Sequence, residues 1–219
     1  MIKSKSEILR GLADPGIVPV VRTQDPDQVP AICKALIDGG MRAVELTLTI
    51  PNAIPTLRAA VSSYGDQVLI GAGTVLDGES CRQALQAGAD FIVSPITRSD
   101  IAEVAIAADR PVILGAYTPT EAQAAHLAGA DIIKIFPADS LGPAYLKALR
   151  GPLPHLKLMP TGGVEMDNMK EFFNAGCVVL GVGSSLIRRS FLANSDWEGL
   201  SKLTRDYVAA ARAAVSQLA

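Results

Sequence analysis

The stretch AGADIIKIFP at residues 128–137 joins the end of a helical pattern to the start of an apolar strand. The same kind of junction recurs as DGGMRAVEL at 38–46, AGADFIVSP at 87–95 and AGCVVLGVG at 175–183. Each time the helical pattern stops at a glycine, which suits the left-handed residue that often ends a helix. The recurrence indicates a chain built from one repeated helix-to-strand unit.

Four further apolar segments complete the series of expected strands. They are GIVPVV at 16–21, VLIGAGTV at 68–75, PVILGA at 111–116 and LKLMPTGGV at 156–164. Seven of the eight strands are followed by an amphipathic helical stretch, and Trp197 to Leu218 supplies the eighth helix. This strict alternation predicts parallel βαβ units with right-handed crossovers.

Eight such units in 219 residues predict the α/β class and a closed (β/α)8 TIM barrel. The alternative is a doubly wound open sheet, which would need a switch point and usually has fewer units. No composition shift or long linker marks a second domain, so we expect a single barrel domain over residues 1–219. A short N-terminal helix at about residues 4–12 is expected to cover the bottom of the barrel. The active site is expected at the carboxyl ends of the strands.

Composition and charge exclude several classes of partner. The chain is 49% hydrophobic with a net charge of −2 and has no Lys/Arg cluster, so we expect no nucleic acid partner. It has neither eighteen consecutive apolar residues nor a signal-peptide pattern, so we expect no membrane partner and a cytoplasmic location. The chain has three widely spaced cysteines, Cys33, Cys81 and Cys177, which form no metal-binding pattern. We expect them to be buried or unreactive thiols.

Lys134 is the most unusual residue of the sixth expected strand. The period of two puts Lys134 and Phe136 on the face that points into the barrel, opposite Ile133 and Ile135. Burial favours the neutral form of an amine, and a neutral amine beside a carbonyl can form a Schiff base. In the alternative interpretation Lys134 reaches solvent or pairs with a carboxylate. Lys157 is a weaker rival, because it lies near the start of its strand, where we expect the bottom rim.

Glu45 is the matching acidic residue on the second expected strand. It shares the inner face with Thr47, and strands two and six lie opposite each other in an eight-stranded barrel. Glu45 is therefore expected to reach a substrate held on Lys134, directly or through one water. The alternative is a structural ion pair between the two side chains, which would not exclude catalysis.

Two residues at strand ends are expected to hold a carboxylate. Arg22 ends the first strand, where a guanidinium can clamp a carboxylate with two hydrogen bonds. Position alone also allows a solvent-facing rim arginine. Thr74 follows the third strand in GAGTVL at 71–76, and its hydroxyl can bond a carboxylate or an enolate.

Two glycine-rich turns follow the seventh and eighth expected strands. Thr161, Gly162 and Gly163 form the first turn, and Gly183 and Ser184 lie in the second. Bare backbone amides at these two loops are the usual phosphate site of a TIM barrel. Either turn alone is a weak signal and could be a plain tight turn, but the pair predicts a phosphate-binding site.

The motifs together resemble those of the 2-keto-3-deoxy-6-phosphogluconate (KDPG) and 6-phosphogalactonate (KDPGal) aldolases. The resemblance runs over residues 16–190 and rests on VELTL, GAGTVL, the Ser-Pro at Pro95, KIFPA, TGGV and the last Gly-Ser. It implies a class I aldolase that needs no metal or cofactor and is usually a homotrimer. It implies that Lys134 forms the Schiff base, that Glu45 shuttles protons, and that Pro95 and Phe136 bind substrate. The products would be pyruvate and glyceraldehyde 3-phosphate.

The resemblance leaves the C4 epimer of the phosphorylated 2-keto acid open. Gluconate-type enzymes often carry an arginine where this chain has Thr49, whereas Arg22 and the Leu-Thr-Ile-Pro stretch look like the galactonate branch. Thr161 is more similar to the gluconate type. Two other functions stay possible: a phosphate-binding isomerase or synthase that uses Glu45 without a Schiff base, and a non-catalytic phosphosugar-binding barrel with Lys134 protonated in an ion pair.

Overall fold

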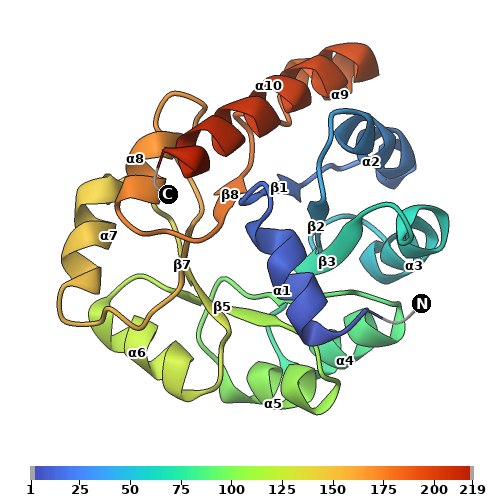
Figure 1. Ribbon diagram of the computed structural model, residues 1–219. Coiled ribbons are helices and arrows are strands. Elements are labelled where there is room, and N and C mark those ends of the chain that lie inside the picture. Colours follow the sequence, from blue (N-terminus) through green and yellow to red (C-terminus); the bar gives the residue numbers. More distant parts are fainter. Residues whose placement is uncertain (1–2, 218–219) are drawn as a thin grey trace.

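The computed structural model describes residues 3–217, in which eight parallel strands alternate with helices around a barrel (Figure 1). Neighbouring strands follow the order β7-β6-β5-β4-β3-β2-β1-β8. Single bridges from Leu158 to Cys177 and from Thr161 to Gly181 join β7 to the segment of β8. The predicted TIM barrel is therefore confirmed, and a doubly wound open sheet is excluded. The strands are β1 (Ile17–Val21), β2 (Ala43–Thr47), β3 (Leu69–Gly73), β4 (Ile92–Val93), β5 (Val112–Ala116), β6 (Ile132–Ile135), β7 (Leu158–Pro160) and β8 (Leu180–Val182).

The outer helices begin where the sequence offers capping residues. Thr118 and Glu121 form a capping box at the start of α6 (Pro119–Leu127), and Asp77 accepts the Ser80 N–H at the start of α4 (Gly78–Gln86). The helix expected to end the chain is α10 (Trp197–Ser216); the last residue expected for it, Leu218, lies outside the described residues. The helices that follow α1 are α2 (Val29–Asp38), α3 (Ala53–Tyr64), α4 (Gly78–Gln86), α5 (Ser99–Ala107), α6 (Pro119–Leu127), α7 (Gly142–Arg150), α8 (Met169–Asn174), α9 (Arg189–Asn194) and α10 (Trp197–Ser216).

Helix α1 (Lys5–Ala13) lies across one end of the barrel, as Figure 1 shows. Its Ile8 and Leu12 are fully buried and belong to an inner apolar cluster with residues such as Val18 and Ile132. Several members of this cluster lie near the starts of their strands, so α1 occludes the amino-terminal end. The carboxyl ends of the strands are left for a site.

Two apolar layers show which way each side chain of β6 points. Ile133 and Ile135 belong to the cluster between the barrel and its helices, whereas Ile132 belongs to the inner cluster. Lys134 is therefore in the inward-facing phase of the strand, as the alternation predicts. Among residues 3–217, no helix combines the length and the apolar character that crossing a membrane would require.

Candidate active site

Lys134 lies on β6, where it is paired with Gly115 of β5 on one side and Met159 of β7 on the other. Only 6% of its side-chain surface is exposed. Its Nζ lies 5.2 Å from the centre of the Phe136 ring, which places the amine against the aromatic face. The amine is thus shielded from bulk water on an inward-facing strand position.

Glu45 approaches Lys134 from β2, where its neighbours across the sheet are Val20 and Gly71. Its side chain is fully buried, and its Oε1 lies 3.8 Å from the Nζ of Lys134. Neither carboxyl oxygen has a hydrogen-bond partner among the described residues. Burial raises the pKa of Glu45, while the charges of Lys134 and Arg22 act to lower it. The geometry matches the ion pair considered from the sequence and leaves both carboxyl oxygens without a hydrogen bond from the described residues.

Two glycines of the strands make this arrangement possible. A Cβ at Gly73 would overlap the carboxylate of Glu45, so only glycine lets the acid lie beside β3. A Cβ at Gly115 would overlap the backbone of Pro95, so glycine also lets the β4–α5 loop approach β5. Both glycines thus make room for other parts of the chain to approach their strands.

A pocket of about 1000 Å³ opens near the carboxyl ends of the strands. It borders β1 and the loops that follow β6, β7 and β8. The residues predicted for the site that do not line this pocket are Lys134, Glu45, Thr74 and Pro95. Phe136 does line it, and the amine of Lys134 lies over the Phe136 ring. The structure therefore separates the predicted site into a buried Lys134–Glu45 pair and an adjoining pocket. The predicted residues that line the pocket are Arg22, Phe136, Thr161, Gly162, Gly163, Gly183 and Ser184.

The two glycine-rich turns lie side by side at this pocket. The Ser185 hydroxyl donates to the carbonyl of Val164 at 2.7 Å, which ties the turn after β8 to the turn after β7. Gly162 and Gly163 have φ angles of +98° and +67°, which residues with a side chain rarely adopt. The buried Thr161 hydroxyl has no hydrogen-bond partner among residues 3–217. The turns thus present bare backbone to the pocket, which suits an anion.

Thr74 and Pro95 lie in the loops after β3 and β4. Thr74 adopts a left-handed backbone with φ +58°, which costs a non-glycine residue about 1–2 kcal/mol. The following residue, Val75, donates its N–H to the Val93 carbonyl at 3.2 Å, which ties the end of this turn to β4. Such strain is found at functional turns, where the surrounding structure imposes it.

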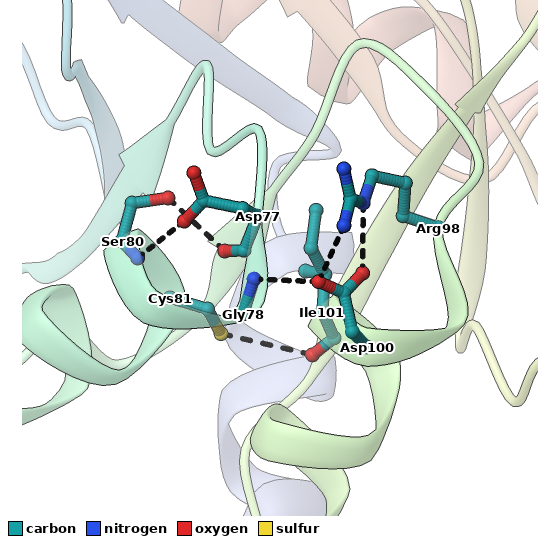
Figure 2. Close-up of polar contacts among 7 residues, drawn as sticks. All are labelled: Asp77, Gly78, Ser80, Cys81, Arg98, Asp100 and Ile101. Atoms are coloured by element: carbon teal, nitrogen blue, oxygen red, sulfur yellow. Dashed lines mark hydrogen bonds and ion pairs between the residues drawn. The ribbon is translucent and has the colours of Figure 1, made fainter.

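A polar network joins these same two loops, as Figure 2 shows. Asp100 accepts the Gly78 N–H at 2.9 Å and pairs with the Arg98 guanidinium at 2.9 and 2.8 Å. The hydrogen bond from the Arg98 side chain has the largest effect on the pKa of Asp100, and the bond from the Gly78 N–H has the next largest. Together they lower this pKa to about 2. The Cys81 thiol donates to the Ile101 carbonyl at 3.7 Å. The start of α4 is thereby fixed to the start of α5, which positions the loops that carry Thr74 and Pro95.

Some residues near the site were not identified from the sequence. Arg189, the first residue of α9, lines the pocket, as do Gln24 and Gln28 of the β1–α2 loop. Helix α9 was not expected, and the only available signal was the IRRSF stretch after the last glycine turn. Lys157, the rival nucleophile, is exposed just before the start of β7, at the opposite end of the barrel.

A family model, proteins of similar sequence and solved structures all match this chain to one group of enzymes. The family model for KDPG and KHG aldolases matches residues 8–203. A 2-dehydro-3-deoxy-6-phosphogalactonate aldolase of Escherichia coli K12 is 39% identical over 78% of this chain and 84% of its own length. A 2-dehydro-3-deoxy-phosphogluconate aldolase of Pseudomonas aeruginosa is 31% identical over 87% of this chain and 86% of its own. The structure of a Legionella pneumophila KDPG aldolase, with pyruvate captured as a covalent carbinolamine, has a TM-score of 0.83 at 28% identity, covering 90% of this chain and 96% of that one.

Proposed function

This chain belongs to the KDPG and KHG aldolase family and is an aldehyde-lyase, and we propose that it cleaves its phosphorylated 2-keto acid through a Schiff base on Lys134. One observation carries the proposal: a buried amine in the barrel interior faces a buried carboxylate 3.8 Å away. The adjoining pocket supplies the bare turns that a phosphate requires.

The reaction begins when the neutral amine of Lys134 attacks the C2 carbonyl, and loss of water leaves an iminium. Glu45, as its carboxylate, removes the proton of the C4 hydroxyl through a water, and the C3–C4 bond breaks. The electron pair of that bond moves into the iminium, which becomes an enamine, and the aldehyde product leaves as glyceraldehyde 3-phosphate. Protonation of the enamine at C3 and hydrolysis of the resulting iminium release pyruvate and restore the lysine.

The remaining predicted residues hold the two charged ends of the substrate. Arg22 and Thr74 bind the carboxylate next to the keto carbon, while Pro95 and Phe136 bound the reacting segment. The phosphate is held at the turns of the pocket, where its binding energy helps to keep the reacting bond in position. The residues assigned to the phosphate are Gly162, Gly163, Gly183 and Ser184.

Borohydride trapping tests the proposal. The protein is incubated with pyruvate, reduced with borohydride and digested, and we expect a mass increase of one reduced pyruvate on the peptide that contains Lys134. A Lys157→Met variant should label to the same extent, because Lys157 lies at the far end of the barrel. Absence of the adduct, or an adduct on Lys157, would refute the proposal and favour an isomerase, a synthase or a non-catalytic binding protein.

Thr161 is proposed to bind the C4 hydroxyl, because this residue lines the pocket and its buried hydroxyl has no hydrogen-bond partner in the described part of the chain. Thr161→Val keeps the shape and removes one hydrogen bond, so we expect kcat/KM for the preferred epimer to fall about tenfold. The value for the other C4 epimer should change less. Steady-state kinetics with KDPG and KDPGal measure both; an equal fall for both epimers would show that Thr161 does not distinguish them.

We propose a homotrimer that forms through an apolar rim, defined as Leu76, Ile96 and Tyr117. These exposed side chains follow β3, β4 and β5, which are adjacent in the barrel. The proposal takes them as one apolar surface of the kind that marks an interaction site. We expect Leu76→Glu to convert the trimer to monomers in size-exclusion chromatography with light scattering. Leu127→Glu, at the other end of the barrel, is the control and should leave the trimer intact; a trimer that survives Leu76→Glu would exclude this contact.

A cytoplasmic location is proposed from the state of the cysteines. All three, Cys33, Cys81 and Cys177, are free and buried. Burial raises the pKa of each thiol to about 12, which keeps it protonated and unreactive. Free buried thiols are typical of proteins that work in a reducing compartment.

A further inference from the structure

The pocket holds a second arginine, Arg189, that the reaction as described does not use. It lies at the start of α9 and lines the same pocket as Arg22, Gly163 and Ser184. Its side chain is exposed, and its guanidinium takes part in none of the ion pairs found among residues 3–217. An arginine held at a pocket wall without a counter-ion is available to an anionic ligand.

The neighbouring residue, Arg188, has a different environment. Its Nε donates to the Ser185 carbonyl at 3.3 Å, and its guanidinium lies 5.9 Å from the centre of the Phe191 ring. Arg188 is thus engaged by its own loop and helix and does not line the pocket. The two adjacent arginines have the same charge but only one of them borders the pocket.

The acidic residues of the pocket leave Arg189 unpaired. Asp25 accepts the Asp27 N–H at 3.0 Å, and Asp139 accepts the Ser140 N–H at 3.0 Å. Neither of these acids, nor Glu165, lies within ion-pair distance of Arg189 or Arg22. The pocket therefore offers two guanidinium groups that form no direct ion pair with any described residue.

We propose that Arg189 is a specificity-determining residue that binds the phosphate of the substrate and selects phosphorylated over unphosphorylated keto acids. The inference rests on the proposed function, in which the substrate carries a carboxylate and a phosphate. Arg22 is assigned to the carboxylate, and the glycine turns offer only neutral donors to the phosphate dianion. Arg189 supplies the full positive charge at that end, and a charge-assisted hydrogen bond is roughly twice as strong as a neutral one.

The test compares Arg189→Gln with the matched control Arg188→Gln. Because Arg189 is assigned to the phosphate end of the substrate and not to the bond that breaks, Arg189→Gln should raise KM for the phosphorylated substrate roughly tenfold or more and lower kcat by a smaller factor. The kcat/KM for the unphosphorylated 2-keto-3-deoxy acid should stay the same, so the preference for phosphate falls. Arg189→Lys should restore part of the preference, and Arg188→Gln should leave it intact.

Binding of inorganic phosphate gives a readout that does not depend on catalysis. Calorimetric titration of the whole protein with phosphate should show weaker binding for Arg189→Gln than for Arg188→Gln and the unaltered chain. Equal phosphate binding and an equal preference in both variants would refute the role of Arg189. Failure of the proposed function is recognised separately, because the unaltered protein would then form no pyruvate adduct with borohydride.

Discussion

Lys134→Met is expected to lower kcat/KM by roughly 10⁴-fold or more, because removal of a covalent nucleophile costs several orders of magnitude in other enzymes. Methionine has a similar length and suits the apolar surroundings of β6, so the barrel should stay folded. Borohydride trapping with pyruvate should be abolished at the same time. Steady-state kinetics and mass spectrometry on the same preparation measure both effects.

The control is Lys157→Met, which removes an exposed lysine before the start of β7. It should retain both turnover and the pyruvate adduct. The decisive contrary result would be a Lys134→Met protein that keeps activity within about tenfold while Glu45→Gln does not. That outcome would assign the chemistry to Glu45 alone and replace the aldolase mechanism with an isomerase or synthase that needs no Schiff base.

Glu45→Gln is expected to lower kcat by roughly 10²–10⁴-fold, the usual contribution of a general acid–base residue. The amide cannot accept the C4 hydroxyl proton, although it fills the same space beside Lys134. In the unaltered enzyme kcat/KM should fall on the acidic side as Glu45 takes up a proton, with an apparent pKa above the ordinary 4.5 because the carboxyl is buried. A pH profile of the Gln variant should lack this acidic limb; an identical limb in both proteins would show that another group is responsible.

The same pKa shift predicts how stability depends on pH. Glu45 has a higher pKa in the folded chain than in the unfolded chain, so folding is favoured by its protonation. This contribution is fully present below pH 4.5 and is lost as the pH rises through the folded pKa. Urea unfolding at several pH values should therefore show that the unaltered chain loses stability relative to Glu45→Gln as the pH rises from 4.5 through the folded pKa of Glu45. If the free energy of unfolding changed with pH in the same way in both proteins, the Lys134 charge would be shown to offset the cost of burying the carboxylate.

The order of the barrel elements could be predicted from the sequence because each depends on local pattern. The helix-to-strand junction at 128–137 and its three relatives located four of the strands, and four further apolar segments located the others, although β4 is only two residues long. The strand is short because Pro95, two residues beyond it, cannot donate to a neighbouring strand. Helix α9 was missed, since its six residues are too few to show a helical period.

The sequence by itself determined that Lys134 and Glu45 point into the barrel, because side-chain direction alternates along a strand whatever the strand packs against. Only the tertiary structure decided that they lie 3.8 Å apart, that no described residue hydrogen-bonds the carboxylate, and that the pocket lies beside the pair. It also decided that Arg189, and not Arg188, borders that pocket. These facts depend on the course of loops from distant strands, which no local period encodes.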